Sequence, residues 1–198
     1  MDFFEVVLHQ RACRAFRPDP PDDELVARVL ESATHAPSAE NRQPWVFVVV
    51  RDPERRAAIG ELGRRVWEGG GRQFSADRLS PRLLEEVDAG ATGGVAAAPV
   101  LVVVGGDTRL GHAAAMGESI FPAVQNLLLA ASAVGLGSAM TTLPVVGDTT
   151  ELRELLGLPD EVLPMAVVPL GWPARPLGPP KRQPLAEKAH RETYGTPW

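Results

Sequence analysis

The sequence is short of cysteine, which limits both its cross-links and its metal chemistry. Cys13 is the only cysteine in 198 residues, so the chain can form no internal disulfide and lacks the paired thiols of structural zinc sites. A lone thiol of this kind is more often a small buried side chain than a nucleophile. Together with the lack of an apolar leader after Met1, it indicates a protein of the reducing cytoplasm.

Positive charge is also in deficit. Lys and Arg number 20 against 25 Asp and Glu, giving a formal net charge of -5 and a pI of about 5.4. A chain with this balance has no general attraction for nucleic acid or for an anionic membrane surface. We therefore expect neither as a partner, and any phosphate that the protein binds must be met by a few local cations.

An apolar run long enough to cross a bilayer is missing too. The most apolar stretch, 119–140, carries Gln125 and Asn126 in its middle and falls short of the roughly 20 apolar residues of a spanning helix. Its apolar residues surround the whole helical circle, which is typical of a helix buried in a core. We expect this central helix to have Pro122 in its first turn and to end near Val134, with Gly135 in the left-handed conformation. A second copy of the chain is one surface that could cover it.

Catalytic signatures are the last absence. The sequence contains no GxSxG, HExxH, CxxC or P-loop motif. Gly135-Leu-Gly137 ends a helix where a dinucleotide fingerprint would open one. No metal-ligand spacing is found among the four histidines, which are His9, His35, His112 and His190. We therefore expect no metal site and no acid–base or nucleophilic constellation.

The patterns that are present describe a single α+β domain over residues 1–198. Besides the central helix, we expect helices over 2–10, 22–34, 52–67, 80–88 and 148–156, and buried strands over 46–50, 99–104 and 165–170. Pro169 inside the last strand favours an edge or a bulge. Residues 68–94 are bracketed by glycines and poor in large apolar side chains, which favours a mobile lid or cap. The proline-rich residues 171–198 predict an extended tail lying over a surface.

Four segments together resemble a known family. They are RACRAFRPDP (11–20), APSAENRQPWVFVVV (36–50), AVQNLLLAASAVGLGSAMTTLP (123–144) and LGWPARPLGPPKRQPLAEKAHRETYG (170–195). In wording, order and spacing they are similar to the FMN-dependent nitroreductase family. The resemblance implies a central mixed β-sheet flanked by helices. It also implies an intertwined homodimer that buries its central helices and holds two FMN molecules between its subunits.

The resemblance further implies which residues meet the cofactor. Arg11 and the backbone of Ala12 correspond to the phosphate and ribityl end, Arg14 to the pyrimidine edge of the ring, and Arg182 to a phosphate ligand. The segment facing the flavin N5 corresponds to Met140, Thr141 and Thr142. The loop that reaches the flavin from the other subunit corresponds to His35, Pro37, Ser38, Ala39 and Asn41. Gln10 and Ala12 stand where many relatives carry arginine and serine, so the backbone must replace one cation and one side-chain donor.

The implied activity is hydride transfer by a ping-pong mechanism. NADH or NADPH reduces FMN, and an electrophile such as a nitroaromatic, a quinone or an activated alkene then takes the hydride. The flavin N5 carries this chemistry, so no catalytic side chain is expected. Two alternatives stay open. One is a flavin- or deazaflavin-binding module without its own turnover, and the other is a specialised member that dehalogenates its substrate or cleaves a ring.

Overall fold

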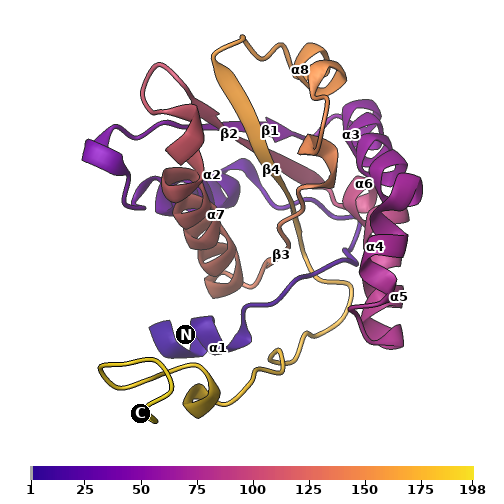
Figure 1. The fold of residues 1–198 in the computed structure, drawn as a ribbon. Helices are drawn as coiled ribbons and strands as arrows, with labels where there is room; N and C mark the ends of the chain where they lie inside the picture. The colour runs from indigo at the N-terminus through magenta and orange to yellow at the C-terminus, as the bar shows by residue number, and fades with distance from the viewer. Residues whose placement is uncertain (1) are drawn as a thin grey trace.

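The structure, a computed structural model, describes residues 2–198 and is built on a four-stranded sheet (Figure 1). The strands are β1 (Trp45–Val50), β2 (Val100–Asp107), β3 (Gly137–Ser138) and β4 (Val162–Gly171), in the order β1-β2-β4-β3. All three strand pairs are antiparallel, where we expected a mixed sheet. Among residues 2–198, parallel pairing is confined to an isolated bridge between Ala12 and Ser138.

Helices cover both faces of this sheet. Successive residues of a strand point to opposite sides, so the apolar strand β2 gives both faces a buried core. Val100, Val102 and Val104 pack against α2 (Asp23–Thr34) and α7 (Met116–Ala133). Leu101 and Val103 pack on the other face with α3 (Pro53–Val66) and α8 (Thr150–Leu156). Every residue of β2 is buried, which confirms the fully buried strand expected at 99–104. The same expectation for 46–50 is wrong, because β1 lies at the sheet edge and is mostly half-buried.

The central helix α7 ends where the sequence predicts and begins earlier. Val134 is its C-cap, and Gly135 has φ +83°. Leu136 N–H donates to Ala131 O (2.8 Å) and Gly135 N–H to Ser132 O (3.1 Å), which are the two bonds of a Schellman motif. Pro122, however, lies inside the helix and not in its first turn, because the helix starts at Met116.

Strand β4 lies inside the sheet, although Pro169 suggested an edge or a bulge. The Pro169 carbonyl accepts from Ala139 N–H at 3.4 Å, so this residue turns its backbone toward the short β3 side. Pairing there is sparse, and the missing N–H of proline interrupts no continuous ladder. A register shift does occur where β2 pairs with β4, between Val104 and Gly105 of β2, but it lies several residues away from Pro169.

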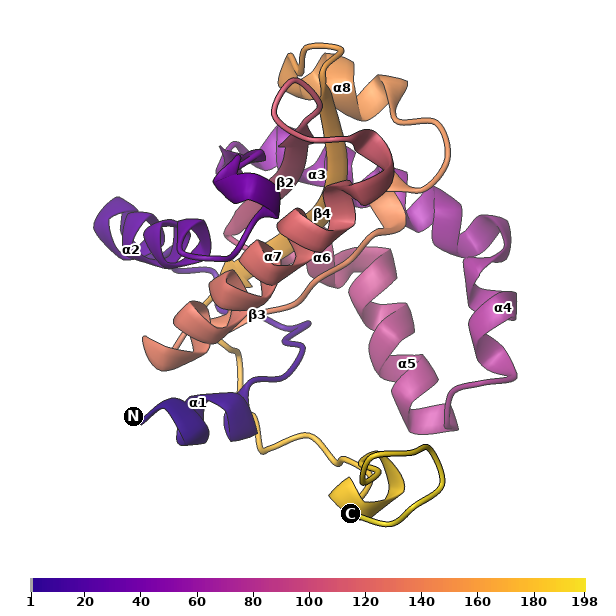
Figure 2. The same ribbon diagram turned by 60° about the vertical axis from the view of Figure 1, so that its left-hand side comes forward.

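Residues 53–97 form a helical hairpin, of which α4 and α5 extend away from the sheet (Figure 2). Its first arm continues from α3 through a π-turn, η2 (Trp67–Gly71), into α4 (Arg72–Ala76). Its second arm is α5 (Pro81–Ala89), a π-turn η3 (Gly90–Gly94) and α6 (Val95–Ala97). The helix expected at 80–88 is confirmed, and the surrounding 68–94 segment is more helical than we expected. Its role as a lid stays a prediction.

The two ends of the chain lie on the same side of the molecule (Figure 1). Helix α1 (Phe3–His9) is capped by Asp2, and the tail beyond Gly171 forms mostly turns and extended backbone as far as Trp198. Short helical turns complete the fold, namely η1 (Ala39–Asn41), η4 (Ala113–Ala115), η5 (Leu143–Val145) and η6 (Leu185–Glu187). Across residues 2–198, no helix has both the length and the apolar character needed to cross a membrane.

Candidate functional site

The candidate site is organised around Cys13 and Arg14, which run between β3 and the η3 turn. Cys13 N–H donates to Ser138 O at 2.9 Å. A Cβ on Gly137 would lie 2.6 Å from Cys13 Sγ, and one on Gly94 would lie 2.4 Å from Arg14 O. Glycine is therefore required on both sides of this segment, since any side chain there would push it away. Two cavities open on either side of it.

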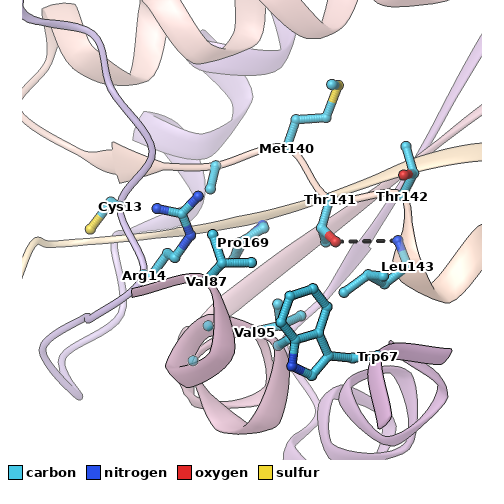
Figure 3. Close-up of a pocket in the computed structure, with 14 residues that line it drawn as sticks. Cys13, Arg14, Trp67, Val87, Val95, Met140, Thr141, Thr142, Leu143 and Pro169 are labelled. Carbon is cyan, nitrogen blue, oxygen red and sulfur yellow. Dashed lines mark hydrogen bonds between the residues drawn. The ribbon is translucent and has the colours of Figure 1, made fainter. Parts of the chain in front are cut away.

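The first cavity is mainly apolar and has a volume of about 240 Å³. Figure 3 shows Arg14 at one end, the segment from Met140 to Leu143 along one wall, and Trp67 with Val95 on the opposite wall. The lining is completed by Cys13, Val87, Gly90, Ala91, Gly94, Ala139 and Pro169. Such a cavity, apolar with one cation at its end, suits a flat ring that carries a polar edge.

Trp67 is fixed in its wall by a hydrogen bond. Trp67 is 3% exposed, and its Nε1–H donates to Asp88 Oδ1 at 3.0 Å. Arg72 Nε–H donates to the same oxygen, also at 3.0 Å. The hydrogen bond from Trp67, reinforced by that from Arg72, lowers the pKa of the Asp88 carboxyl. The carboxylate thus holds the two arms of the hairpin together beside the cavity.

The opposite wall presents backbone donors. Thr141 exchanges two backbone hydrogen bonds with Val167 (2.9 and 2.8 Å), and its Oγ1 accepts from Leu143 N–H at 3.3 Å. Over residues 2–198, the N–H groups of Met140 and Thr142 take part in no hydrogen bond. They are therefore available to acceptor atoms of a ligand.

The second cavity, of about 140 Å³, is lined by cations. Arg11, Arg14 and Arg175 face it together with one carboxylate, Glu86. Arg11 Nη1–H donates to Gly178 O at 3.3 Å, and its Nη2 lies 3.7 Å from Glu86 Oε2. Burial lowers the pKa of Arg14, but a guanidinium stays charged at any physiological pH. The excess of positive charge makes this cavity suitable for an anionic group.

Cys13 lies between the two cavities but is not set up as a nucleophile. The residue is 1% exposed, and its Sγ–H donates to Ala15 O at 3.3 Å. Burial raises the pKa of the thiol, so the thiolate is disfavoured. This agrees with its interpretation from the sequence as a small buried residue.

The loop 35–44 lies elsewhere, against the N-terminal half of α7. Ala39 N–H donates to the buried Ser119 Oγ at 3.2 Å, and Gln43 N–H donates to Ser38 Oγ at 3.0 Å. Three residues of the loop have positive φ, namely Glu40 (52°), Asn41 (55°) and Gln43 (53°). A non-glycine backbone held in this region is strained and is common at binding sites.

The residues implied by the resemblance therefore fall into three places. One group converges on the two cavities, and it consists of Arg11, Ala12, Arg14, Met140, Thr141 and Thr142. A second group lies on the 35–44 loop and lines neither cavity, and it consists of His35, Pro37, Ser38, Ala39 and Asn41. Arg182 is exposed in the tail, where its Nη1–H donates to Lys181 O at 3.2 Å.

Sequence reasoning missed several residues that line the cavities. They are Trp67, Glu86, Gly90, Gly94 and Arg175. The glycines at 93–94 were visible as a bracket of the 68–94 segment, but their contact with Arg14 depends on how the hairpin folds back. Arg175 precedes the expected phosphate ligand by seven positions, and no local pattern distinguishes it from other arginines of the tail.

The chain is similar in sequence and in structure to several known proteins. A protein of Thermus thermophilus named NADH dehydrogenase is 33% identical over 196 residues, which cover 93% of this chain and 93% of its own. An iodotyrosine deiodinase of Thermotoga neapolitana is 30% identical over 176 residues, covering 87% of this chain and 89% of its own. Among solved structures, a nitroreductase with bound FMN from Desulfitobacterium hafniense is 26% identical, with a TM-score of 0.77 over 97% of this chain and 100% of that one.

This structural similarity confirms the nitroreductase-like fold of one chain, with an antiparallel sheet in place of the mixed sheet that we expected. The sequence profile described as Nitroreductase family matches residues 7–172, which is most of the chain. The likeness therefore extends from the end of α1 through the segment around Arg14, the central helix and all four strands. On this evidence, the chain belongs to the nitroreductase family.

Proposed function

We propose that this protein is an FMN-dependent oxidoreductase that takes hydride from NADH or NADPH and passes it to an electrophilic small molecule. The observation that carries this proposal is the meeting of an apolar cavity and a cationic cavity at Cys13 and Arg14. FMN has the matching form, because a flat ring with a polar edge is joined through a ribityl chain to a dianionic phosphate. Together the cavities lie in the lower part of the range of roughly 300–1,000 Å³ typical of ligand sites.

Each part of the site has a role toward that cofactor. Arg11 and Arg175 would hold the phosphate, and Arg14 would meet the pyrimidine edge of the ring, where negative charge develops on reduction. The free N–H groups of Met140 and Thr142 would donate to the ring along its edge. When bound, FMN supplies the hydride-transfer chemistry.

The lining of the apolar cavity explains why no catalytic side chain is needed. Only Cys13 and Arg14 among its lining residues are titratable, and neither exchanges a proton near neutral pH, because the thiol pKa is raised by burial and the guanidinium stays charged. General acid–base catalysis by the protein is therefore not part of the proposal. What the chain contributes is position, charge and an apolar wall.

The proposal includes a homodimer. Helix α1 exposes Phe3 and Phe4, and α7 exposes Phe121, so each chain has an uncovered apolar side along these two helices. A second copy covering that side would bring its 35–44 loop toward the flavin. This would give His35, Pro37, Ser38, Ala39 and Asn41 their expected role, although they lie apart from the cavities of their own chain. The cytoplasmic location and the lid role of 68–94 remain parts of the proposal.

The iodotyrosine deiodinase relative favours a second candidate. That protein's name describes removal of a halogen, so a specialised reaction of this kind on the same flavin site is the main alternative. A flavin- or deazaflavin-binding module without turnover is the other. The dehalogenating enzyme differs from the proposed oxidoreductase in the molecule that accepts the hydride. The binding module differs in that NADH and NADPH do not reduce its flavin.

Colour provides the test. We expect the purified protein to be yellow with an absorbance spectrum of bound FMN, and the colour to bleach when NADH or NADPH is added without oxygen. Adding a quinone or a nitroaromatic should restore it. A protein that is yellow but inert to both nucleotides would favour the binding module, and a protein that binds no flavin would overturn the proposal.

A further inference from the structure

Glu86 is the one acidic side chain among the residues that line the cationic cavity. It lies on α5 of the hairpin, and its side chain is 25% exposed. Its Oε2 is 3.7 Å from Arg11 Nη2, inside the cavity, and its Oε1 is 3.5 Å from Arg82 Nε, one helical turn earlier. Arg82 is 86% exposed. The carboxylate therefore has one cationic partner facing the cavity and another facing solvent.

Both contacts are weak in geometry. Each is longer than a hydrogen bond between an amine and a carboxylate, which is about 2.7–2.9 Å, and over residues 2–198 the Glu86 carboxylate accepts no hydrogen bond. Its charge also reaches Arg14, whose pKa it raises against the effect of burial. Little holds this carboxylate in one position, but it reduces the positive charge of the cavity.

A phosphate that binds Arg11 meets the same carboxylate. Two anions cannot share one guanidinium without repulsion, and the partly exposed cavity screens that repulsion only in part. Glu86 can relieve it by turning toward Arg82, which lies at the i,i+4 spacing that favours a pair on a helix surface. The carboxylate then leaves the cavity while keeping a cationic partner.

We propose that Glu86 is an internal competitor for the phosphate end of the cofactor, which pairs with Arg11 and moves to Arg82 when the phosphate enters. This rests on the proposed function, since it concerns the same flavin site. It follows that Glu86 weakens the binding of FMN but not of riboflavin, which lacks the phosphate. It also follows that α5, and with it the hairpin, changes its contacts when the site is filled.

The test compares both flavins in the full chain, stripped of cofactor and checked for its fold by circular dichroism. Glu86→Gln keeps the shape of the side chain and removes its charge. We expect it to tighten FMN binding about tenfold, a change of about 1.4 kcal/mol, and to change riboflavin binding less than twofold. Glu85→Gln is the matched control, because Glu85 is the exposed neighbour on the same helix and faces no described cation.

A second variant tests the movement. Arg82→Gln removes the outer partner, so FMN should bind about threefold more weakly than to the wild type, with riboflavin again unchanged. In the Glu86→Gln background the same change should have no effect, because the two residues then no longer interact. Salt screens the charges, so the differences in FMN affinity between these variants and the wild type should become smaller as the salt concentration rises.

The proposal is wrong if Glu86→Gln leaves FMN binding unchanged, since the carboxylate would then have no effect on the cofactor. It is also wrong if the change weakens FMN binding, since the carboxylate would then help to hold the cofactor. Parallel gains for FMN and riboflavin would also overturn it, because they would show an effect on the ring end. These results differ from failure of the proposed function, in which the wild type binds neither flavin.

Discussion

Trp67 owes its position to Asp88, a single acceptor on the other arm of the hairpin. The indole N–H and the Arg72 guanidinium converge on one carboxylate oxygen, while the ring of Trp67 forms a wall of the apolar cavity (Figure 3). The residue that shapes the pocket and the residue that fixes it therefore come from segments about twenty positions apart. A substitution at Asp88 should therefore alter the position of Trp67 in the pocket wall, although Asp88 itself contacts no ligand.

The pH dependence of stability should reveal this carboxylate. Its pKa is lowered in the folded protein, so its stabilising contribution is present above the pKa of an ordinary aspartate, about 3.9, and is lost as pH falls through the folded value. Asp88→Asn should therefore lower the unfolding free energy at pH 7, and its difference from the wild type should shrink below about pH 4. Urea unfolding at several pH values measures this.

Asp77→Asn serves as the control for that experiment. Asp77 is exposed on the same hairpin, and no hydrogen bond or ion pair of its side chain occurs within residues 2–198. Its difference from the wild type should stay small at every pH. If Asp88→Asn behaves in the same way, the Trp67 and Arg72 contacts contribute nothing to stability.

At the scale of elements, the end of α7 depends on the conformation of one residue. Gly135 has φ +83°, and a Cβ added there would meet only the Trp172 ring at 3.7 Å, an ordinary contact. Gly135→Ala should cost roughly 1–2 kcal/mol, because an alanine in the left-handed region is strained. Gly135→Asn should cost less, because asparagine tolerates this region.

The denaturant midpoints of the wild type, Gly135→Ala and Gly135→Asn measure the differences in stability, provided that the three proteins have the same dependence of unfolding free energy on denaturant. Equal losses for alanine and asparagine would contradict the explanation, because they would point to crowding by Trp172 rather than to backbone strain. The Schellman bonds to Ala131 and Ser132 should survive in both variants.

This end of the helix could be predicted because its cause is local, and the parts that were wrong depend on distant residues. Gly135 sets its own conformation, whereas within residues 2–198 no side chain caps the start of α7, and so no local signal opposed placing that start near Pro122. The partial exposure of β1 could not be predicted, because β1 at the edge and β2 in the middle are both rich in valine. Strand order comes from the packing of the whole sheet.

The candidate site shows the same division. Arg11, Arg14 and the 140–142 segment were found because they lie in short, characteristic stretches, and the fold brings them together. Trp67, Glu86 and Arg175 enter the site only because the hairpin and the tail fold back upon residues 11–15. No spacing within the sequence contains that information.

At the scale of the whole molecule, α7 has a buried side and an uncovered side. Phe121 is 40% exposed, whereas Leu128 is 8% exposed and belongs to the core. If the uncovered side forms the dimer interface, Phe121→Asp should give a folded monomer that loses FMN. Leu128→Asp should instead unfold the chain, because an unpaired charge in the core costs several kcal/mol.

Sedimentation velocity, with detection of both protein and flavin absorbance, separates the two outcomes, and circular dichroism reports the fold. A Phe121→Asp protein that remains a dimer would place the interface elsewhere. A monomer that retains one FMN per chain would show that the 35–44 loop of a second copy is not needed.

The position of the single thiol has a practical consequence for following motion in solution. Cys13 lies between the two cavities and is only 1% exposed, so an alkylating reagent reaches the sulfur only when residues 11–15 separate from β3 or from the hairpin. With one cysteine in the chain, every labelling event reports that same opening. The rate of alkylation therefore measures local unfolding at the centre of the site, in the same way that hydrogen exchange measures the opening around a buried amide.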